Sequence, residues 1–178
     1  MDRARLIKQF DKLLPLAADW AEKLEARILR EGVPLPEEGM LDARELGVRE
    51  PERVRLLCLA SVPTPEDPIL RAAAAVVQFL TPATRGLALR YGIFLRHDCW
   101  GDRALVAHEL AHTAQYERLG GIGPFLRPYL FECLTLGYPA APMEQEAIAE
   151  ARRIEAGRLA LTTSRVAPTF RCSSQWSR

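Results

Sequence analysis

The chain has 178 residues, about the length of one ordinary domain. With 48% hydrophobic and 26% charged residues, it has the composition of a globular protein that can bury a hydrophobic core. Its 24 Lys and Arg residues balance 23 Asp and Glu residues, which argues against a nucleic-acid-binding protein because such proteins carry a basic excess.

Targeting segments are not evident in the sequence. No stretch has the roughly 20 consecutive apolar residues of a membrane-spanning helix. The first residues (MDRARLIKQFDKLL) mix charges among apolar positions, unlike a signal peptide. We therefore expect a cytoplasmic protein without membrane contact. The cysteines are widely spaced, so we expect neither a disulfide framework nor a Cys-rich zinc finger; they are Cys58, Cys99, Cys133 and Cys172.

The first part of the chain has the pattern of an amphipathic helix. Apolar residues recur at helical spacing from Leu6 to Ile28, and Pro15 should either kink this helix or begin a second one. A linker rich in Pro, Gly and Glu (EGVPLPEEG) and a short helical stretch follow. We interpret residues 1–50 as an N-terminal helical segment that packs on the core or extends it.

The middle of the chain predicts two strands with a helix between them. Arg53–Val62 reads as a strand, and the alanine-rich segment Pro68–Leu80 predicts a buried helix. Between Gly86 and Arg96 apolar residues alternate as in a single strand, which would place one set on one face: Leu87, Leu89, Tyr91, Ile93 and Leu95.

The remainder of the chain predicts three helices. Asp102 is placed to cap a helix near 102–118, which a run of glycines, Gly120, Gly121 and Gly123, should end. Further helices are expected over Pro124–Leu136 and Pro142–Leu161, followed by a loose tail over 163–178. The predicted fold class is α+β. Residues 51–162 would form a mostly helical domain with a small sheet, from strands near 53–62 and 86–96.

All three histidines of the chain lie between positions 97 and 112. Two of them, His108 and His112, form the motif HExxH together with Glu109. On a helix, positions i and i+4 share one face, so both imidazoles can bind one zinc ion. Glu109 is turned by about 100° from His108, near the metal but free to act on a water molecule. The residues around the motif are apolar nearly all round, which predicts a buried helix in which unpaired polar groups would be costly.

A catalytic zinc ion has three protein ligands, so one more must come from elsewhere in the chain. His97 lies at the end of the preceding predicted strand. Glu144 and Glu146 lie in the first turn of the helix that begins at Pro142. Glutamates at a helix start can also serve only the helix dipole, so the residues alone leave this ligand open.

A strand, a turn, a helix bearing HELAH and a later helix with a glutamate before alanine resemble the gluzincin branch of the zincin metallopeptidases, over about residues 84–160. The resemblance implies a zincin-like domain holding zinc through His108, His112 and a downstream glutamate. Glu146-Ala147 matches the family pattern better than Glu144-Gln145, so the resemblance favours Glu146 as the third ligand, with Glu144 in reserve. The metzincin extension xxGxxH is absent.

The activity that the resemblance implies is that of a zinc-dependent peptidase acting on a peptide or protein substrate. Glu109 would be the general base for a zinc-bound water, and the strand at 86–96 would take an extended substrate. Candidate donors to the developing oxyanion are Tyr129, Tyr138, His97 and Arg127. Two alternatives stay open. One is a non-catalytic zinc-binding scaffold or interaction module of zincin type, and the other is a helical interaction protein in which HELAH is accidental.

Overall fold

The computed structural model describes residues 2–77 and 80–164, with side chains described as far as residue 157. These residues form an α+β fold, as the sequence predicts. Among them the helices are α1 (Arg3–Glu31), α2 (Glu37–Glu45), α3 (Pro68–Val77), α4 (Arg103–Leu119), α5 (Ile122–Leu136) and α6 (Pro142–Ser164), and the strands are β1 (Val33–Pro34), β2 (Arg55–Leu59), β3 (Gly86–Leu89) and β4 (Gly92–Arg96). Of the predicted tail, residues 163 and 164 continue α6, and 165–178 lie outside the described residues.

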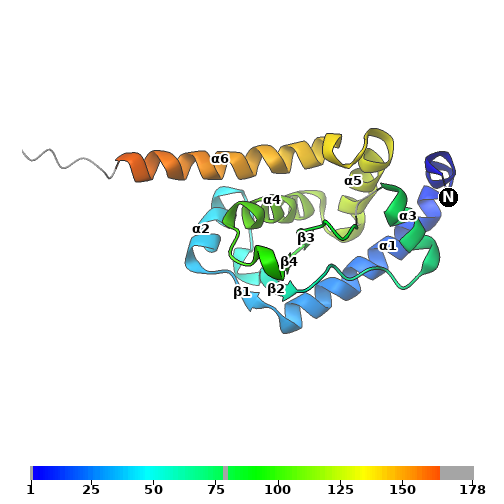
Figure 1. The fold of residues 1–178 in the computed structure, drawn as a ribbon, viewed down its shortest axis with the longest axis horizontal. Coiled ribbons are helices and arrows are strands. Elements are labelled where there is room, and N and C mark those ends of the chain that lie inside the picture. The colour runs from blue at the N-terminus through cyan, green and yellow to red at the C-terminus, as the bar shows by residue number, and fades with distance from the viewer. Residues whose placement is uncertain (1, 78–79, 165–178) are drawn as a thin grey trace, which may run out of the picture.

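The elements are arranged in layers (Figure 1). The sheet has the order β1-β2-β4-β3, in which β2 and β4 are parallel and the other neighbours antiparallel. Helix α1 covers one face of this sheet, and α4 packs against β3 on the other side. Helix α6 lies along α4, on the side of α4 away from the sheet. Helix α4 is therefore enclosed between the sheet and α6, which explains its apolar sequence.

One hydrophobic core joins the N-terminal helix to the rest of the fold. Deeply buried members come from α1, the sheet and α4, among them Ile28, Ile93, Phe94, Leu110 and Tyr116. The first fifty residues thus share the core that supports the HExxH helix. Within the described residues, no helix has both the length and the apolar character needed to cross a membrane.

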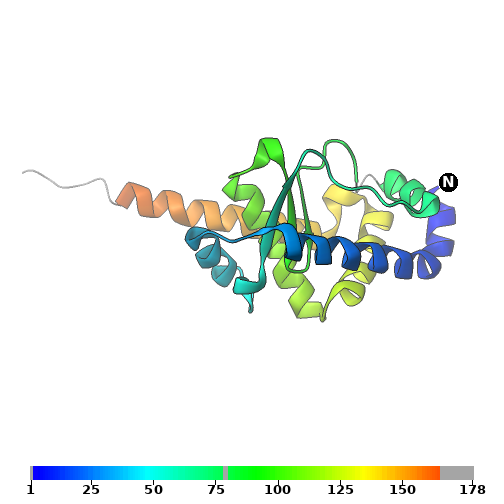
Figure 2. The same ribbon diagram turned by 90° about the horizontal axis from the view of Figure 1, so that it is seen from below.

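Helix α1 is continuous through Pro15, which lies inside it. Figures 1 and 2 show that its first turns leave the direction of the remaining helix. A proline in a helix interior removes one backbone hydrogen bond and crowds the preceding turn, which bends the axis. The sequence predicted that Pro15 either kinks one helix or begins a second one. The structure shows one bent helix.

The single strand predicted over Gly86–Arg96 is wrong, because the chain reverses at Arg90 and forms the hairpin β3–β4. Leu87 pairs with Phe94 and Ala88 with Ile93, so Leu87 and Ile93 lie on opposite faces. Arg90 has a φ of 55°, which side-chain-bearing residues rarely adopt. Glu25 of α1 holds this turn: it accepts hydrogen bonds from the Arg90 guanidinium at 2.9 and 2.8 Å and from the Tyr91 N–H at 3.1 Å.

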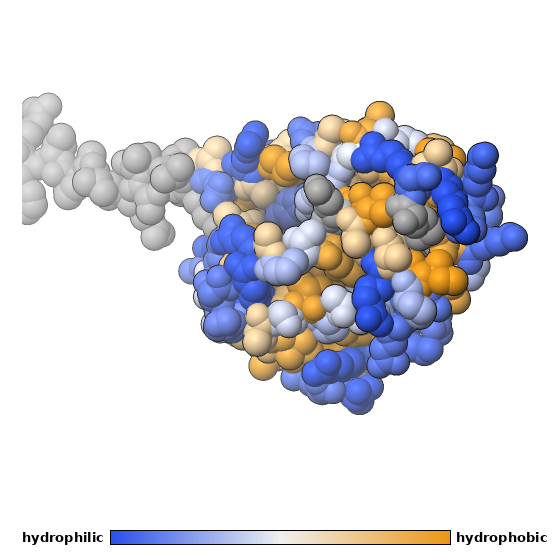
Figure 3. Space-filling view, turned by 45° about the vertical axis from the view of Figure 1, so that its right-hand side comes forward, coloured by the Kyte–Doolittle hydropathy of each residue, from blue (hydrophilic) through white to orange (hydrophobic). Residues whose placement is uncertain are grey.

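Helix α3 is less buried than predicted. Leu70 is its buried residue, and Ile69 on the same helix is 52% exposed. Alanine side chains bury little area, so the helix lies at the surface over α1. The inner side of α3, together with α1 and α5, lines an apolar pocket. Figure 3 shows a face of the molecule on which apolar side chains gather around a hollow.

Helix α4 begins and ends where the sequence predicts. The Asp102 side chain caps it by accepting from the Leu105 N–H at 3.1 Å, and Gly120 ends it with a φ of 97°. Helix α5 starts at Ile122, so Gly123, predicted to belong to the helix stop, lies inside the next helix.

Candidate metal centre

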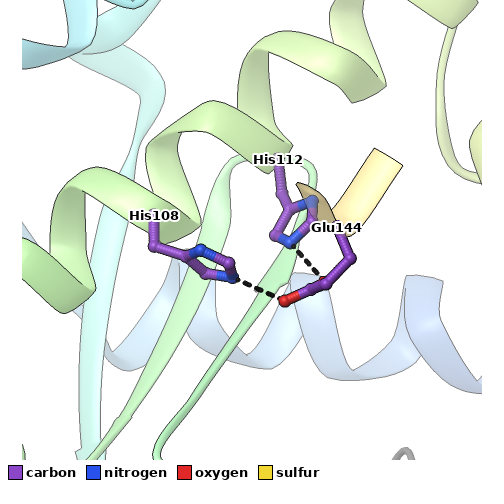
Figure 4. Close-up of side chains that lie close together, drawn as sticks. All are labelled: His108, His112 and Glu144. Carbon is purple, nitrogen blue, oxygen red and sulfur yellow. Dashed lines mark ion pairs between the residues drawn. The ribbon is translucent and has the colours of Figure 1, made fainter. Parts of the chain in front are cut away.

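The two histidines of the HExxH motif project from successive turns of α4 towards the first turn of α6, where they meet Glu144 (Figure 4). The Nε2 atom of His108 lies 3.2 Å from Oε1 of Glu144, and the Nε2 atom of His112 lies 3.3 Å from Oε2. Both imidazoles therefore face the same carboxylate, each through its Nε2 atom.

The three side chains are placed so that they could hold a metal ion. One ligand atom from each of His108, His112 and Glu144 can be chosen so that all lie within 4.8 Å of one another. Ligand atoms at about 2.0–2.1 Å from a tetrahedral zinc ion lie roughly 3.3–3.4 Å apart. The two nitrogen–oxygen distances, 3.2 and 3.3 Å, are close to this value, although each runs to a different oxygen of Glu144. Two imidazoles and one carboxylate also form a ligand set known from catalytic zinc sites.

Glu146, the residue expected to complete the set, lies elsewhere. Its carboxylate accepts hydrogen bonds from the Arg118 guanidinium at 2.7 and 2.8 Å and from Nε2 of Gln115 at 3.1 Å. Its side chain is 41% exposed, whereas that of Glu144 is 4% exposed. The structure thus brings Glu144 to the two histidines and leaves Glu146 on the outer side of the helix pair.

A helical pattern in the sequence contained the signal for Glu144. Among the α6 side chains that the structure describes, up to residue 157, the buried ones after Met143 are Glu144, Ala147, Ala151 and Ile154, at the three- and four-residue spacing of one helix face. This face packs on α4, and Glu146 is about 200° away from Glu144 around the axis. The match of Glu146-Ala147 to the family pattern compared neighbours in sequence, which do not share a helix face.

Neighbouring side chains hold two residues of the centre, Glu144 and His112, in place. The hydroxyl of Tyr129 in α5 donates to Oε2 of Glu144 at 3.0 Å. The other ring nitrogen of His112, Nδ1, lies 2.8 Å from Oε1 of Gln115, one turn further along α4. Ligand side chains of metal sites are commonly oriented by such neighbours.

The charges of the centre depend on one another. Burial would raise the pKa of Glu144, but hydrogen bonds from His108 and His112 outweigh burial and hold this pKa well below its usual range. Burial would lower the pKa of His108, but the hydrogen bond to Glu144 and the charges of Glu109 and Glu144 outweigh it and raise that pKa. Glu144 is thus kept as a carboxylate, the form that binds a metal.

Glu109 points from α4 to strand β3. It is 4% exposed, and burial raises its pKa against the lowering effect of the two histidines and the Ala88 N–H. A Cβ atom built at Gly86 would collide with the Glu109 carboxylate. The glycine therefore lets the carboxylate lie directly against the backbone of the edge strand.

A pocket opens beside the centre, bordered by β3, α4 and α5. Its lining includes Gly86, His108, Glu109, Tyr129 and Tyr138. Two of the four predicted oxyanion donors, the tyrosines, therefore lie at the site.

The other two predicted donors lie away from the pocket lining. His97 is an exposed residue of the short turn after β4, and Arg127 pairs with Asp11 at 2.9 Å on the surface. His97 is also not among the residues that meet at Glu144.

Comparisons of the chain with family models, with curated proteins and with solved structures find no match.

Proposed function

We propose that this protein is a zinc-dependent hydrolase, most simply a peptidase, in which His108, His112 and Glu144 hold the metal and Glu109 is the general base. The observation that carries the proposal is a His-His-Glu set whose two histidines line one pocket together with the separate carboxylate of Glu109. Glu109 follows His108 directly but points to β3, so it is available for proton transfer while the other three bind the ion.

The chemistry divides between the metal and the chain. Zinc held by His108, His112 and Glu144 would lower the pKa of a coordinated water molecule to near 7 and would polarise a carbonyl group. Glu109 accepts a proton from the attacking water and delivers it to the leaving nitrogen. Tyr129 and Tyr138 line the same pocket and are the candidates for donating to the developing oxyanion.

The position of β3 suggests an extended substrate. Among the described strands, β3 pairs with β4 and lies at the edge of the sheet. Residues Gly86–Ala88 of this strand line the pocket next to Glu109. The Ala88 backbone of this edge already hydrogen-bonds to Tyr116 and Glu109 of α4. An extended peptide pairing with the edge near Gly86 would bring its carbonyl groups past Glu109 and the histidines.

Substitution of Glu109 tests the catalytic part of the proposal. We expect Glu109→Gln to lower hydrolysis of a peptide library, followed by mass spectrometry, by about 10²–10⁴-fold, because the amide cannot accept the proton. Zinc content should be unchanged, since Glu109 is not a ligand. Glu155→Gln, at an exposed position of α6, is the matched control. Undiminished hydrolysis in Glu109→Gln would exclude Glu109 as the base.

A second candidate function is a zinc-binding module without catalysis. The observation in its favour is the burial of the group: Glu109, His112 and Glu144 are 4%, 6% and 3% exposed. Access for a substrate is correspondingly narrow. A wild-type protein that holds one zinc ion but cleaves no peptide of the library would support this alternative.

A further inference from the structure

We infer that Gln115 is a positioning residue of the proposed metal centre, held in its orientation by Glu146. It presents an acceptor to His112 and at the same time ties α4 to the turn of α6 that carries Glu144. The inference deepens the proposed function and rests on the metal site proposed there.

The orientation of the Gln115 amide follows from its partners. Its nitrogen lies 2.9 Å from the Met143 carbonyl oxygen and 3.1 Å from Oε2 of Glu146. Both of these are acceptors, so the NH₂ group must face them. A flipped amide would set its oxygen against two oxygens and its nitrogen against His112. The amide oxygen of Gln115 therefore faces Nδ1 of His112, at 2.8 Å.

The state of the His112 ring follows from the amide. An amide oxygen only accepts, so Nδ1 of His112 must carry a hydrogen. Nε2, which lies 3.3 Å from Glu144, is then the nitrogen that would present a lone pair to a metal ion, in place of its hydrogen bond to that carboxylate. Gln115 thus selects the ring nitrogen that binds the metal and fixes the rotation of the ring.

The same amide connects the two helices that supply the ligands. Met143, whose carbonyl accepts from Gln115, directly precedes Glu144 in α6. A single side chain therefore contacts one ligand and the residue next to another. Gln115 is 1% exposed, so water does not compete for these hydrogen bonds.

Glu146 and Arg118 complete the arrangement at the surface. The Arg118 guanidinium donates to both carboxylate oxygens of Glu146, at 2.7 and 2.8 Å. One of these oxygens also accepts from Gln115. Glu146, which the family resemblance favoured as a metal ligand, is thus linked to the proposed ligand His112 through Gln115.

The test combines zinc affinity with the state of the His112 ring. We expect Gln115→Met, which keeps the volume but cannot accept a hydrogen bond, to weaken zinc binding by about 10–100-fold. Glu146→Ala should weaken it by roughly 3–10-fold, because the amide loses one of its two acceptors. Gln145→Met, at an exposed position of the same α6 turn, is the control and should bind zinc as the wild type does.

A spectroscopic readout separates positioning from general stability. Two-bond ¹H–¹⁵N NMR spectra of the zinc-loaded wild type should show a hydrogen-bonded Nδ1–H on His112, and Gln115→Met should lose the hydrogen-bond shift of this proton. If Gln115→Met does not fold, Glu146→Ala still provides the test, because the Glu146 side chain is half-exposed and its loss should not prevent folding. Unchanged zinc affinity in folded Gln115→Met, or in Glu146→Ala, would overturn the inference.

Failure of the metal site itself has a different signature. A wild-type chain that binds no zinc contradicts the metal site. The Nδ1–H signal of metal-free His112 then still tests the contact with Gln115: its presence in the wild type and loss in Gln115→Met supports the orientation, and equal spectra overturn it.

Discussion

Glu109 lies so close to β3 that the strand has room there only for a glycine. The Glu109 carboxylate occupies the place where a Cβ atom of Gly86 would stand. In the proposed hydrolase Glu109 is the general base, which must be within hydrogen-bond reach of its proton, so small movements of this carboxylate should affect catalysis more than they affect folding.

Gly86→Ala is therefore expected to displace Glu109 and to lower peptide hydrolysis by about 10–100-fold. Zinc binding should persist, because the atoms nearest to the added Cβ belong to Glu109 and not to the three ligands. Rates of hydrolysis and zinc content measured on the same preparation check the prediction. Gly157→Ala, where a Cβ meets nothing within 4 Å, is the control, and hydrolysis lowered equally in both variants would contradict it.

At the scale of elements, the β3–β4 hairpin depends on a contact from α1. Glu25 is 3% exposed and accepts three hydrogen bonds from the turn residues Arg90 and Tyr91. The strained φ of Arg90 is thus stabilised by a residue 65 positions earlier in the chain.

We expect Glu25→Gln to lower the free energy of unfolding by about 2 kcal/mol, because one ionic partner of a part-buried network is lost. Urea unfolding of the metal-free protein measures this change. Asp11→Asn, which breaks the exposed pair with Arg127, should leave the unfolding midpoint unchanged. Equal midpoints for wild type and Glu25→Gln would show that the turn does not need this carboxylate.

The contact between α4 and α6 depends on small residues. Ala107 of α4 packs with Ala151 and Ile154 of α6, and the two alanines are 1% and 8% exposed. A larger side chain at this contact must push the helices apart or distort them.

Ala151→Leu is expected to destabilise the fold by about 1–3 kcal/mol. It should also weaken zinc binding, because Glu144 lies two turns earlier on the same helix face. Thermal unfolding and zinc titration check both effects. Ala149→Leu, on the exposed side of α6, should change neither, and a loss of zinc affinity in Ala149→Leu equal to that in Ala151→Leu would argue against the packing explanation.

The sequence predicted the elements whose signals are local. Asp102 and Gly120 mark the ends of α4, and the apolar residues around HExxH predicted its burial correctly. The hairpin turn was missed because Arg90 carries no turn signal of its own; Glu25, distant in sequence, stabilises it. Glu146 was favoured over Glu144 because it precedes an alanine in the sequence. The position of each glutamate around the helix axis was the relevant signal, and the adjacent alanine was not. Gln115 was not singled out, since two of its partners, Met143 and Glu146, lie on another helix.

At the scale of the whole molecule, the three proposed metal ligands come from α4 and α6, while α1 and the sheet support α4 from the other side. An ion bound by His108, His112 and Glu144 would therefore crosslink two helices of one core. A ligand that binds only the folded state stabilises it by mass action.

Zinc at 100 times its dissociation constant should add about 2.7 kcal/mol to the free energy of unfolding, and a chelator should remove this gain. For a chain of this size the melting temperature should rise by roughly 5–10 °C. Calorimetry with zinc and with chelator measures the shift. In Glu144→Ala the two melting curves should nearly coincide; a full zinc-dependent shift in that variant would place the metal elsewhere.

The identity of the third ligand is tested most directly by the metal content of two matched variants. Wild-type protein and Glu146→Gln, purified and dialysed against dilute zinc, should each hold one zinc ion per chain by elemental analysis, because the amide oxygen introduced at position 146 can still accept from Gln115. Glu144→Gln should hold far less than one. A wild type without stoichiometric zinc, or a Glu144→Gln that retains the ion while Glu146→Gln loses it, would contradict the His108–His112–Glu144 centre.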